Sequence, residues 1–225
     1  MPRKPKTNLD VIGKEVEQLK IGIMGGAFDP PTLGHIQVAR LILRETNLNE
    51  VWLMPCYNHA ADKKMTDPNI RYEMCKLAIE NETNMHVLPY EIQHKIEGGT
   101  FQFVKRFLRD IYLAHIPYEF SYIIGMDNAD NFAKWKHSEA LKKAIRFIVV
   151  PRKGVERKNK DVWYEKDPHT FVNVTDYIIE ISSTEIRNLI KENNNKEANN
   201  YLDKKVSKYI NSKGLYRKCG NTKEI

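Results

Sequence analysis

A short apolar run that breaks into two glycines and then into a helical pattern constrains this chain more than any other feature. The run covers residues 21–24, Gly25 and Gly26 follow it, and the helical pattern covers 33–46. The amino end of a helix has unpaired backbone N–H groups and a partial positive charge, which attract phosphate. Adjacent glycines let a ligand approach the main chain where a Cβ atom would clash. The sequence therefore predicts a buried strand, a phosphate-binding turn and a helix.

Strand-like and helical segments alternate along the rest of the chain. This alternation is typical of parallel βαβ units with right-handed crossovers, and continuous apolar strands indicate a sheet covered on both faces. The predicted fold class is α/β, a doubly wound, Rossmann-like parallel sheet with a helical carboxyl end, whose ligands bind at the carboxyl ends of the strands. Strands are expected at 20–24, 51–54, 85–88, 120–124, 145–150 and 170–174. Helices are expected at 33–46, 68–81, 100–115, 183–193 and 199–212, with a broken helical stretch over 128–143, a loop over 152–168 and a polar connector over 192–200.

The length of 225 residues favours one domain. We expect a basic, disordered arm over 1–18, a single domain over 19–217 and a tail over 218–225. No apolar stretch is long enough to cross a membrane or to serve as a secretion signal, so no membrane partner is expected. Cys56, Cys75 and Cys219 are not closely spaced, which suits a reducing compartment; we expect the cytoplasm, with the nucleus as the alternative. No motif for structural zinc or another protein-bound metal is present.

The formal net charge is +7. The basic surplus lies mainly in 152–160 and 201–225, without a stripe of interleaved aromatic residues. A solvated, lysine-rich surface explains this pattern best, attraction of anionic nucleotides comes second, and nucleic-acid binding is a distant third. We therefore expect small nucleotides as partners and no nucleic acid, and the sequence leaves a homo-oligomer open.

Thr32 and His35 lie at the start of the first helix. They are three residues apart, so on a helix they share one face. A hydroxyl and an imidazole beside a phosphate-binding turn indicate phosphate chemistry. Taken alone, the pair is better explained as a helix cap and a surface histidine. The segment matches neither the Gly-x-Gly-x-x-Gly of dinucleotide-binding oxidoreductases nor a Walker P-loop.

A second helix start carries hydroxyl groups and a guanidinium. Ser182 and Glu185 have the spacing of a capping box. Ser183, Thr184 and Arg187 project from one face of the same helix, and arginine suits bidentate contact with phosphate. The segment therefore predicts a second phosphate-binding site.

Together these two segments resemble the nucleotidylyltransferase superfamily. Residues 26–35 read Gly-Ala-Phe-Asp-Pro-Pro-Thr-Leu-Gly-His, and residues 181–187 read Ile-Ser-Ser-Thr-Glu-Ile-Arg. More specifically, residues 20–217 resemble nicotinate/nicotinamide mononucleotide adenylyltransferases, because they contain that family's motifs in the same order. The matching residues are 71–74, 124–127, Trp135, 149–152 and 201–216. The resemblance implies adenylyl transfer from ATP to nicotinate or nicotinamide mononucleotide, giving deamido-NAD or NAD and pyrophosphate in NAD biosynthesis. It also implies Mg²⁺, with ATP as co-substrate.

The resemblance assigns roles to particular residues. It implies that the ATP phosphates and ribose contact Gly25, Gly26, Phe28 and His35. The β- and γ-phosphates would contact Ser183, Thr184 and Arg187, and the adenine and ribose side would be lined by Gly125, Asp127 and Arg152. The mononucleotide would contact Lys63, Lys64, Arg71, Thr100, Gln102 and Trp135. Trp135 would stack on the pyridine ring, and a half-buried core aromatic is the equal alternative.

The expected mechanism needs no protein base, because the attacking phosphate is already ionised near neutral pH. Positioning and charge stabilisation would carry the reaction, with His35, Arg187 and Thr32 as the catalytic group. His35 would donate to the α-phosphate, and Arg187 would neutralise the departing pyrophosphate.

Three departures from the family pattern make the prediction of the substrate less secure than the prediction of the reaction type. Bacterial members usually have His at position 32, their Pro-Pro-His-Lys is replaced by 58–64, and their Ser-Tyr-Thr is replaced by 100–102. The choice between acid and amide mononucleotide stays open. The alternatives are a phosphopantetheine-type adenylyltransferase, a class I aminoacyl-tRNA synthetase (on Leu33-Gly34-His35 and 63–66), and a non-catalytic module that binds nucleotide or RNA.

Overall fold

The computed structural model describes residues 18–58, 65–151, 162–172 and 181–218. Within them, six parallel strands form one sheet in the order β3-β2-β1-β4-β5-β6. The strands are β1 (Leu19–Gly26), β2 (Glu50–Pro55), β3 (Met85–Val87), β4 (Tyr118–Gly125), β5 (Arg146–Val150) and β6 (Thr170–Phe171). The chain runs outward from β1 to β3 and then crosses to β4, so the switch point of the sheet lies between β1 and β4. The predicted doubly wound parallel fold is confirmed.

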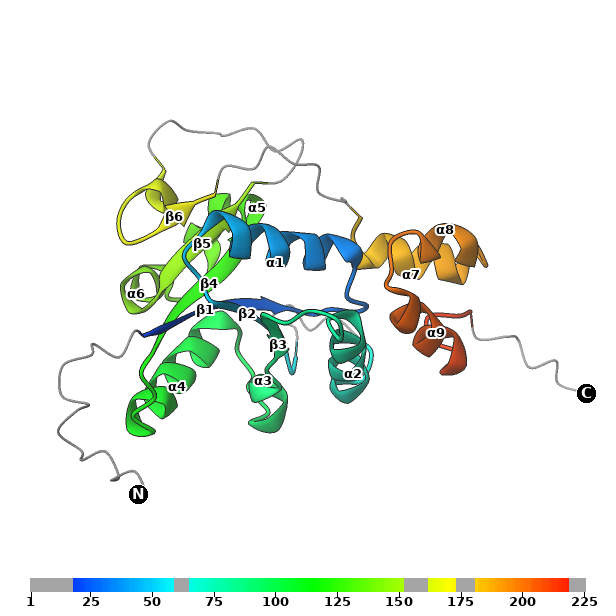
Figure 1. Ribbon diagram of the computed structural model, residues 1–225, viewed down its shortest axis with the longest axis horizontal. Coiled ribbons are helices and arrows are strands. Elements are labelled where there is room, and N and C mark those ends of the chain that lie inside the picture. The colour runs from blue at the N-terminus through cyan, green and yellow to red at the C-terminus, as the bar shows by residue number, and fades with distance from the viewer. Residues whose placement is uncertain (1–17, 59–64, 152–161, 173–180, 219–225) are drawn as a thin grey trace, which may run out of the picture.

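Helices cover both faces of the sheet (Figure 1). The helices that follow the first four strands are α1 (Leu33–Glu45), α2 (Pro68–Ala78), α3 (Tyr90–Gln93), α4 (Thr100–Leu113), α5 (Met126–Asp130) and α6 (Ser138–Ala144). One apolar cluster joins α1 to Leu53 and Ile148 of the sheet. A second joins α4 to Ile23 and Phe147 on the opposite face. Burial of both faces explains why the strands read as continuous apolar runs.

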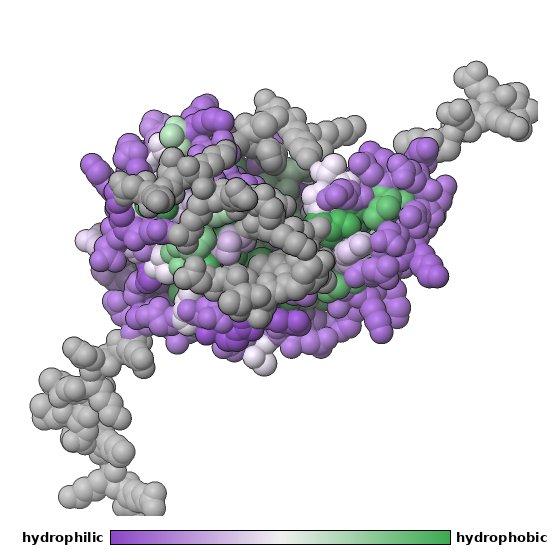
Figure 2. All heavy atoms as spheres, turned by 90° about the horizontal axis from the view of Figure 1, so that it is seen from above, coloured by the Kyte–Doolittle hydropathy of each residue, from purple (hydrophilic) through white to green (hydrophobic). Residues whose placement is uncertain are grey.

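Three more helices close the described chain: α7 (Ser183–Lys191), α8 (Asn195–Asn199) and α9 (Lys204–Ser212). They lie beyond the amino end of α1, near the carboxyl ends of the strands (Figure 1). A third apolar cluster packs α7 and α9 against Met74 of α2. Where the face seen from above is coloured in Figure 2, hydrophilic side chains predominate, with hydrophobic ones in patches between them. The helical carboxyl end is thus packed beside the edge of the sheet where ligands are expected.

The structure corrects three element predictions. The helix expected over 199–212 is divided, because Asp203 caps a new helix by accepting from the Lys205 N–H at 2.7 Å. Residues 195–199, expected to be a connector, form α8. The four-residue helix α3 was not predicted, since it is too short for a periodic pattern. The broken stretch over 128–143 is confirmed as α5, a 3₁₀ turn (Phe132–Lys134) and α6.

Several predictions fall on residues outside the described ranges. They are the arm over 1–18 apart from its last residue, the tail beyond 218, most of the loop over 152–168, and Lys63, Lys64, Arg152 and Cys219. Residues 163–165 of that loop form a 3₁₀ turn (Trp163–Glu165), and the last strand is described only as far as Phe171. Among the described helices, none has both the length and the apolar composition needed to span a membrane.

Candidate active site

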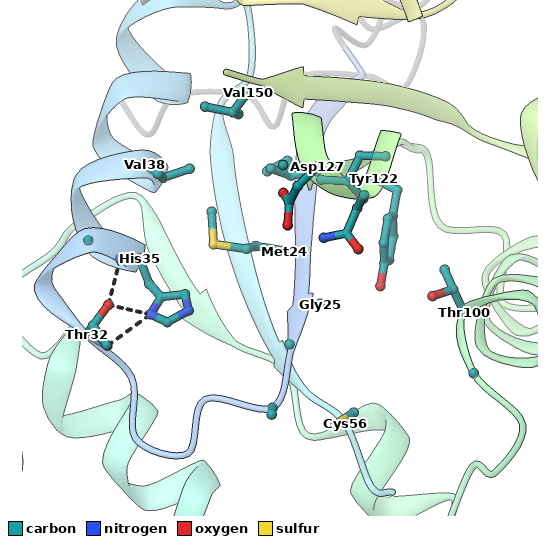
Figure 3. Close-up of a pocket in the computed structure, with 18 of the residues that line it drawn as sticks. Met24, Gly25, Thr32, His35, Val38, Cys56, Thr100, Tyr122, Asp127 and Val150 are labelled. Atoms are coloured by element: carbon teal, nitrogen blue, oxygen red, sulfur yellow. Dashed lines mark hydrogen bonds between the residues drawn. The ribbon is translucent and has the colours of Figure 1, made fainter. Parts of the chain in front are cut away.

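A pocket of about 410 Å³ lies at the carboxyl ends of β1, β4 and β5, between the amino ends of α1 and α4 (Figure 3). This is the switch point of the sheet, where doubly wound folds bind their ligands. The predicted site residues that line it are Gly25, Gly26, Thr32, His35, Thr100, Gly125, Asp127 and Trp135. The structure therefore brings together residues that the sequence separates by up to 110 positions.

Thr32 and His35 cap α1 reciprocally. The Thr32 N–H donates to His35 Nδ1 at 3.0 Å, and the His35 N–H donates to Thr32 Oγ1 at 3.3 Å. A backbone N–H can only donate, so Nδ1 accepts and the proton of the neutral ring is on Nε2. The imidazole faces the pocket in Figure 3. The cap and the catalytic interpretation of this pair are therefore compatible, because the cap fixes the tautomer that makes Nε2 a donor.

The turn after β1 is shaped by a tyrosine. A Cβ atom on Gly25 would lie 2.1 Å from the Tyr122 hydroxyl oxygen, so only glycine fits there. Tyr122 is buried on β4, and this burial raises the pKa of its phenol well above the usual range. Figure 3 shows both residues beside the cavity. The close approach expected of a ligand at Gly25 is thus already made by a side chain of the protein.

Phe28 supports the imidazole without lining the pocket. It adopts φ +47°, in the left-handed region that bulky residues rarely occupy. Its side chain is buried, and its ring lies edge-on to that of His35, with 5.1 Å between the centroids. Phe28 therefore contacts His35, the residue predicted to bind phosphate.

The second predicted motif meets the first at the turn before α1. Ser183 Oγ donates to the carbonyl of Pro30 at 2.8 Å, and Arg187 Nη1 donates to the carbonyl of Asp29 at 2.7 Å. Arg187 Nη2 also donates to Thr184 Oγ1 at 3.0 Å. The capping box of Ser182 and Glu185 is confirmed. These contacts hold the start of α7 beside the pocket, although Ser183, Thr184 and Arg187 do not themselves line it.

Arg71 is fully buried and joins three segments of main chain. Its guanidinium donates to the carbonyls of Thr66 at 2.9 Å, Ala27 at 2.7 Å and Cys56 at 2.7 Å. It does not line the pocket beside His35. In the structure Arg71 ties the end of β1 to the end of β2. Its predicted contact with the mononucleotide stays a prediction.

The α3 and α4 side of the pocket contains a buried carboxyl that the sequence analysis missed. Glu91 on α3 is 8% exposed and accepts from the Tyr57 N–H at 3.4 Å. Burial raises the pKa of the Glu91 carboxyl to about 7 and that of the neighbouring Cys56 thiol to about 11. The one available signal was position, because Glu91 follows the third strand at the carboxyl edge. Of the predicted residues nearby, Thr100 lines the pocket and Gln102 is exposed on α4 outside it.

Comparison with characterised families agrees with this geometry. The model of the cytidylyltransferase-like family matches residues 23–189. The probable nicotinate-nucleotide adenylyltransferase of Clostridium botulinum (strain Okra, type B1) is 34% identical over 204 residues, which cover 87% of this chain and 98% of that protein.

This chain belongs to the cytidylyltransferase-like family, among the nicotinate-nucleotide adenylyltransferases.

Solved structures of such adenylyltransferases share the fold. Plasmodium falciparum nicotinic acid mononucleotide adenylyltransferase complexed with NaAD superposes with a TM-score of 0.72 at 25% identity, covering 88% of this chain and 97% of that one. The same enzyme complexed with APC gives a TM-score of 0.73 at 25% identity, covering 88% and 98%. The phosphopantetheine-type, aminoacyl-tRNA synthetase and non-catalytic alternatives are therefore not supported.

No group of three or more His, Cys, Asp or Glu side chains in the described part of this adenylyltransferase could hold a metal ion. The described residues thus do not form a protein-built metal site of the usual donor set. ATP itself supplies phosphate oxygens, which are the ligands that Mg²⁺ prefers.

Proposed function

We propose that this adenylyltransferase transfers the adenylyl group of ATP to nicotinate mononucleotide, giving deamido-NAD and pyrophosphate in NAD biosynthesis. One observation carries the proposal. A single pocket extends from His35, at a helix start suited to phosphate, to Thr100 and Trp135, where a ring can bind. The Plasmodium falciparum enzyme, which shares this fold, is complexed with NaAD in one solved structure and with APC in another, and this supports a nucleotide-binding role for the fold.

In this proposal the triphosphate lies across the glycine turn and the start of α1. The Nε2–H of His35 donates to the α-phosphate, where charge develops as the bond to pyrophosphate breaks. Ser183, Thr184 and Arg187 hold the β- and γ-phosphates from the start of α7. Because these side chains contact the turn at 29–30, binding of the phosphates requires Arg187 to exchange or share its contact with Asp29.

The adenosine half is assigned to the β4 and β5 side. Asp127, at the start of α5, is placed to accept from ribose hydroxyl groups, and Val38 and Val150 offer apolar contact to the adenine ring. Glycine at position 125 leaves room for this carboxylate, because a Cβ atom there would lie 2.6 Å from Asp127 Oδ1. Arg152 stays a prediction on this side.

The mononucleotide half is assigned to the α3 and α4 side. Trp135 is half-buried and packs on Phe132, with 5.0 Å between the ring centroids, while it also lines the pocket. It can therefore serve the core with one face and the pyridine ring with the other. Lys63, Lys64 and Gln102 stay predictions for the same half.

The reaction needs an ionised 5′-phosphate as nucleophile, so positioning and charge stabilisation carry it. We propose that a divalent cation, Mg²⁺, enters as part of the ATP complex. No step is assigned to a metal held by the protein.

The test is to incubate the purified chain with ATP and Mg²⁺ and to supply one acceptor at a time: nicotinate mononucleotide, nicotinamide mononucleotide or 4′-phosphopantetheine. Pyrophosphate release and the mass of the product are followed. We expect the largest kcat/KM with nicotinate mononucleotide and formation of deamido-NAD. Release that requires only 4′-phosphopantetheine, or no release with any acceptor, would refute the proposal.

A further inference from the structure

The carboxyl-terminal part of the chain holds the loop between β1 and α1 through side chains and main chain. Beyond the contacts of Ser183 and Arg187, the Leu33 N–H donates to the carbonyl of Tyr201 at 2.9 Å. Tyr216, the residue that lies farthest along the chain among these, donates its hydroxyl to Asp29 Oδ1 at 2.6 Å. The loop that carries the phosphate turn is thus fixed from a segment 187 residues away.

The contact between Tyr216 and Asp29 is buried. Asp29 is 4% exposed, and its other oxygen, Oδ2, accepts from the Thr66 N–H at 3.1 Å. Burial, and then the Asp29 carboxylate, raise the pKa of the Tyr216 phenol well above the usual range, so the hydroxyl remains a donor. Loss of this donor would leave a buried carboxylate oxygen without its charge-assisted hydrogen bond, which is the costly way to break such a pair.

The backbone around Tyr216 is shaped to make this contact. After α9 the chain turns at Gly214, with φ +61°, and Leu215 joins the apolar cluster of the carboxyl-terminal helices. Tyr216 itself has φ +64°, a conformation that is strained for a side chain of its size. Such outliers persist where the surrounding contacts require them, and here the phenol also approaches Met74 Sδ at 3.9 Å.

Asp29 is well placed to transmit this constraint to the reacting groups. It directly follows Phe28, whose ring contacts His35, and its carbonyl accepts from Arg187. It lies three residues before Thr32, which fixes the tautomer of His35. A shift of Asp29 would therefore move the two groups assigned to the phosphates.

We propose that Tyr216 is a positioning residue of the active site, which acts through Asp29 to hold the phosphate loop in its working geometry. The inference rests on the proposed function for its kinetic consequence. Because the contact lies at the phosphate end of the pocket, the use of ATP depends on it and the binding of the mononucleotide does not.

The first test compares Tyr216→Phe with the matched control Tyr209→Phe, on the face of α9 where Tyr209 stacks with Lys213. We expect Tyr216→Phe to lower kcat/KM for ATP by roughly 10-fold, the effect of one lost hydrogen bond to a charged group. The KM for the mononucleotide should stay within about two-fold of wild type, as should all parameters of the control. Equal losses toward both substrates, or wild-type kinetics, would overturn the proposal.

The second test asks whether Tyr216 acts through Asp29. Asp29→Asn is measured alone and together with Tyr216→Phe, and urea unfolding of each variant is recorded in parallel. If the two residues form one unit, the double variant is within about two-fold of Asp29→Asn alone. The proposal would be overturned if the losses of kcat/KM for ATP in the two single variants multiplied in the double variant. It would also be overturned if the variants lowered the urea unfolding midpoint and left kcat/KM for ATP unchanged.

A binding measurement separates this inference from the proposed function. Titration calorimetry with adenosine 5′-(α,β-methylene)triphosphate measures the binding of an ATP analogue at the phosphate loop, and no acceptor is present. Weaker binding to Tyr216→Phe than to wild type and Tyr209→Phe supports the positioning role, even if no tested mononucleotide accepts the adenylyl group. Equal binding to all three proteins, together with an unchanged kcat, contradicts it.

Discussion

The two ends of the pocket are built in different ways. The part of the phosphate end that lines the pocket comes mainly from one continuous segment, 25–35, whose backbone and cap residues adjoin one another in sequence, and α7 and Tyr216 hold that segment from outside the pocket. The opposite end is assembled from side chains on separate elements, among them Cys56 after β2, Glu91 on α3, Thr100 on α4 and Trp135. A contiguous end can be constrained by local rules of turns and caps, whereas a dispersed end depends on packing between elements. The pocket lining at the phosphate end is therefore encoded mainly in one local motif, which long-range contacts hold in place, whereas the acceptor end is formed only when separate elements pack together.

The largest effect is expected at the contiguous end. His35→Ala removes the Nε2–H donor and should lower kcat by about 10²–10³, as is typical when one transition-state donor is lost. Steady-state kinetics with ATP and nicotinate mononucleotide measure it. The control is His115→Asn, an exposed residue after α4 whose positive φ of 52° asparagine tolerates. Turnover near that of wild type would remove His35 from the mechanism.

At the dispersed end, the buried Glu91 should make the free energy of unfolding depend on pH. Its pKa is raised from 4.5 to about 7 by burial, so the folded state binds this proton more tightly than the unfolded state. The associated stability is complete below about pH 4.5 and is lost as the pH rises through 7. Relative to Glu91→Gln, the unfolding free energy of wild type should fall by about 3 kcal/mol between pH 4.5 and pH 8.

Urea unfolding at several pH values measures this difference, and Glu97→Gln, at an exposed position in the same loop region, is the control. Glutamine can still accept from the Tyr57 N–H, so the change isolates the titrating proton. A difference between wild type and Glu91→Gln that does not vary with pH would show that Glu91 titrates normally.

Gly25 connects the two ends, because its neighbour Tyr122 faces the dispersed side. Gly25→Ala should destabilise the protein by about 1–3 kcal/mol, the usual range for overpacking, since the new Cβ would lie 2.1 Å from the Tyr122 hydroxyl oxygen. Adding Tyr122→Phe removes that oxygen and leaves the ring carbon at 3.0 Å, so part of the loss should be recovered. The urea unfolding midpoints of Gly25→Ala and of the double variant measure this recovery. No recovery would mean that the clash lies elsewhere.

Features set by neighbouring residues could be predicted from the sequence, whereas features set by packing between separate elements could not. The sheet and most of its helices were predictable because strand and helix periods and caps are local, as the capping box of Ser182 shows. The short helix α3 and the buried state of Arg71 were not, because nothing in a few neighbouring residues says that a guanidinium will be surrounded by carbonyls. Tyr122 and Glu91 were missed for that reason. Each looks like an ordinary strand or loop residue until β4 pairs with β1 and α3 packs against β2.

The smallest effect is expected at Trp135. Trp135→Phe keeps an aromatic ring on Phe132 and reduces the surface offered to the pyridine ring, so the KM for nicotinate mononucleotide should rise by only about 2- to 10-fold, in line with the modest energy of aromatic pairs. The KM for ATP should not change. Trp163→Phe is a close control, because Trp163 also packs on Phe132, with 4.6 Å between centroids, but does not line the pocket. If the two variants raise the mononucleotide KM equally, Trp135 serves only the core, and the dispersed end must hold its ligand by other groups.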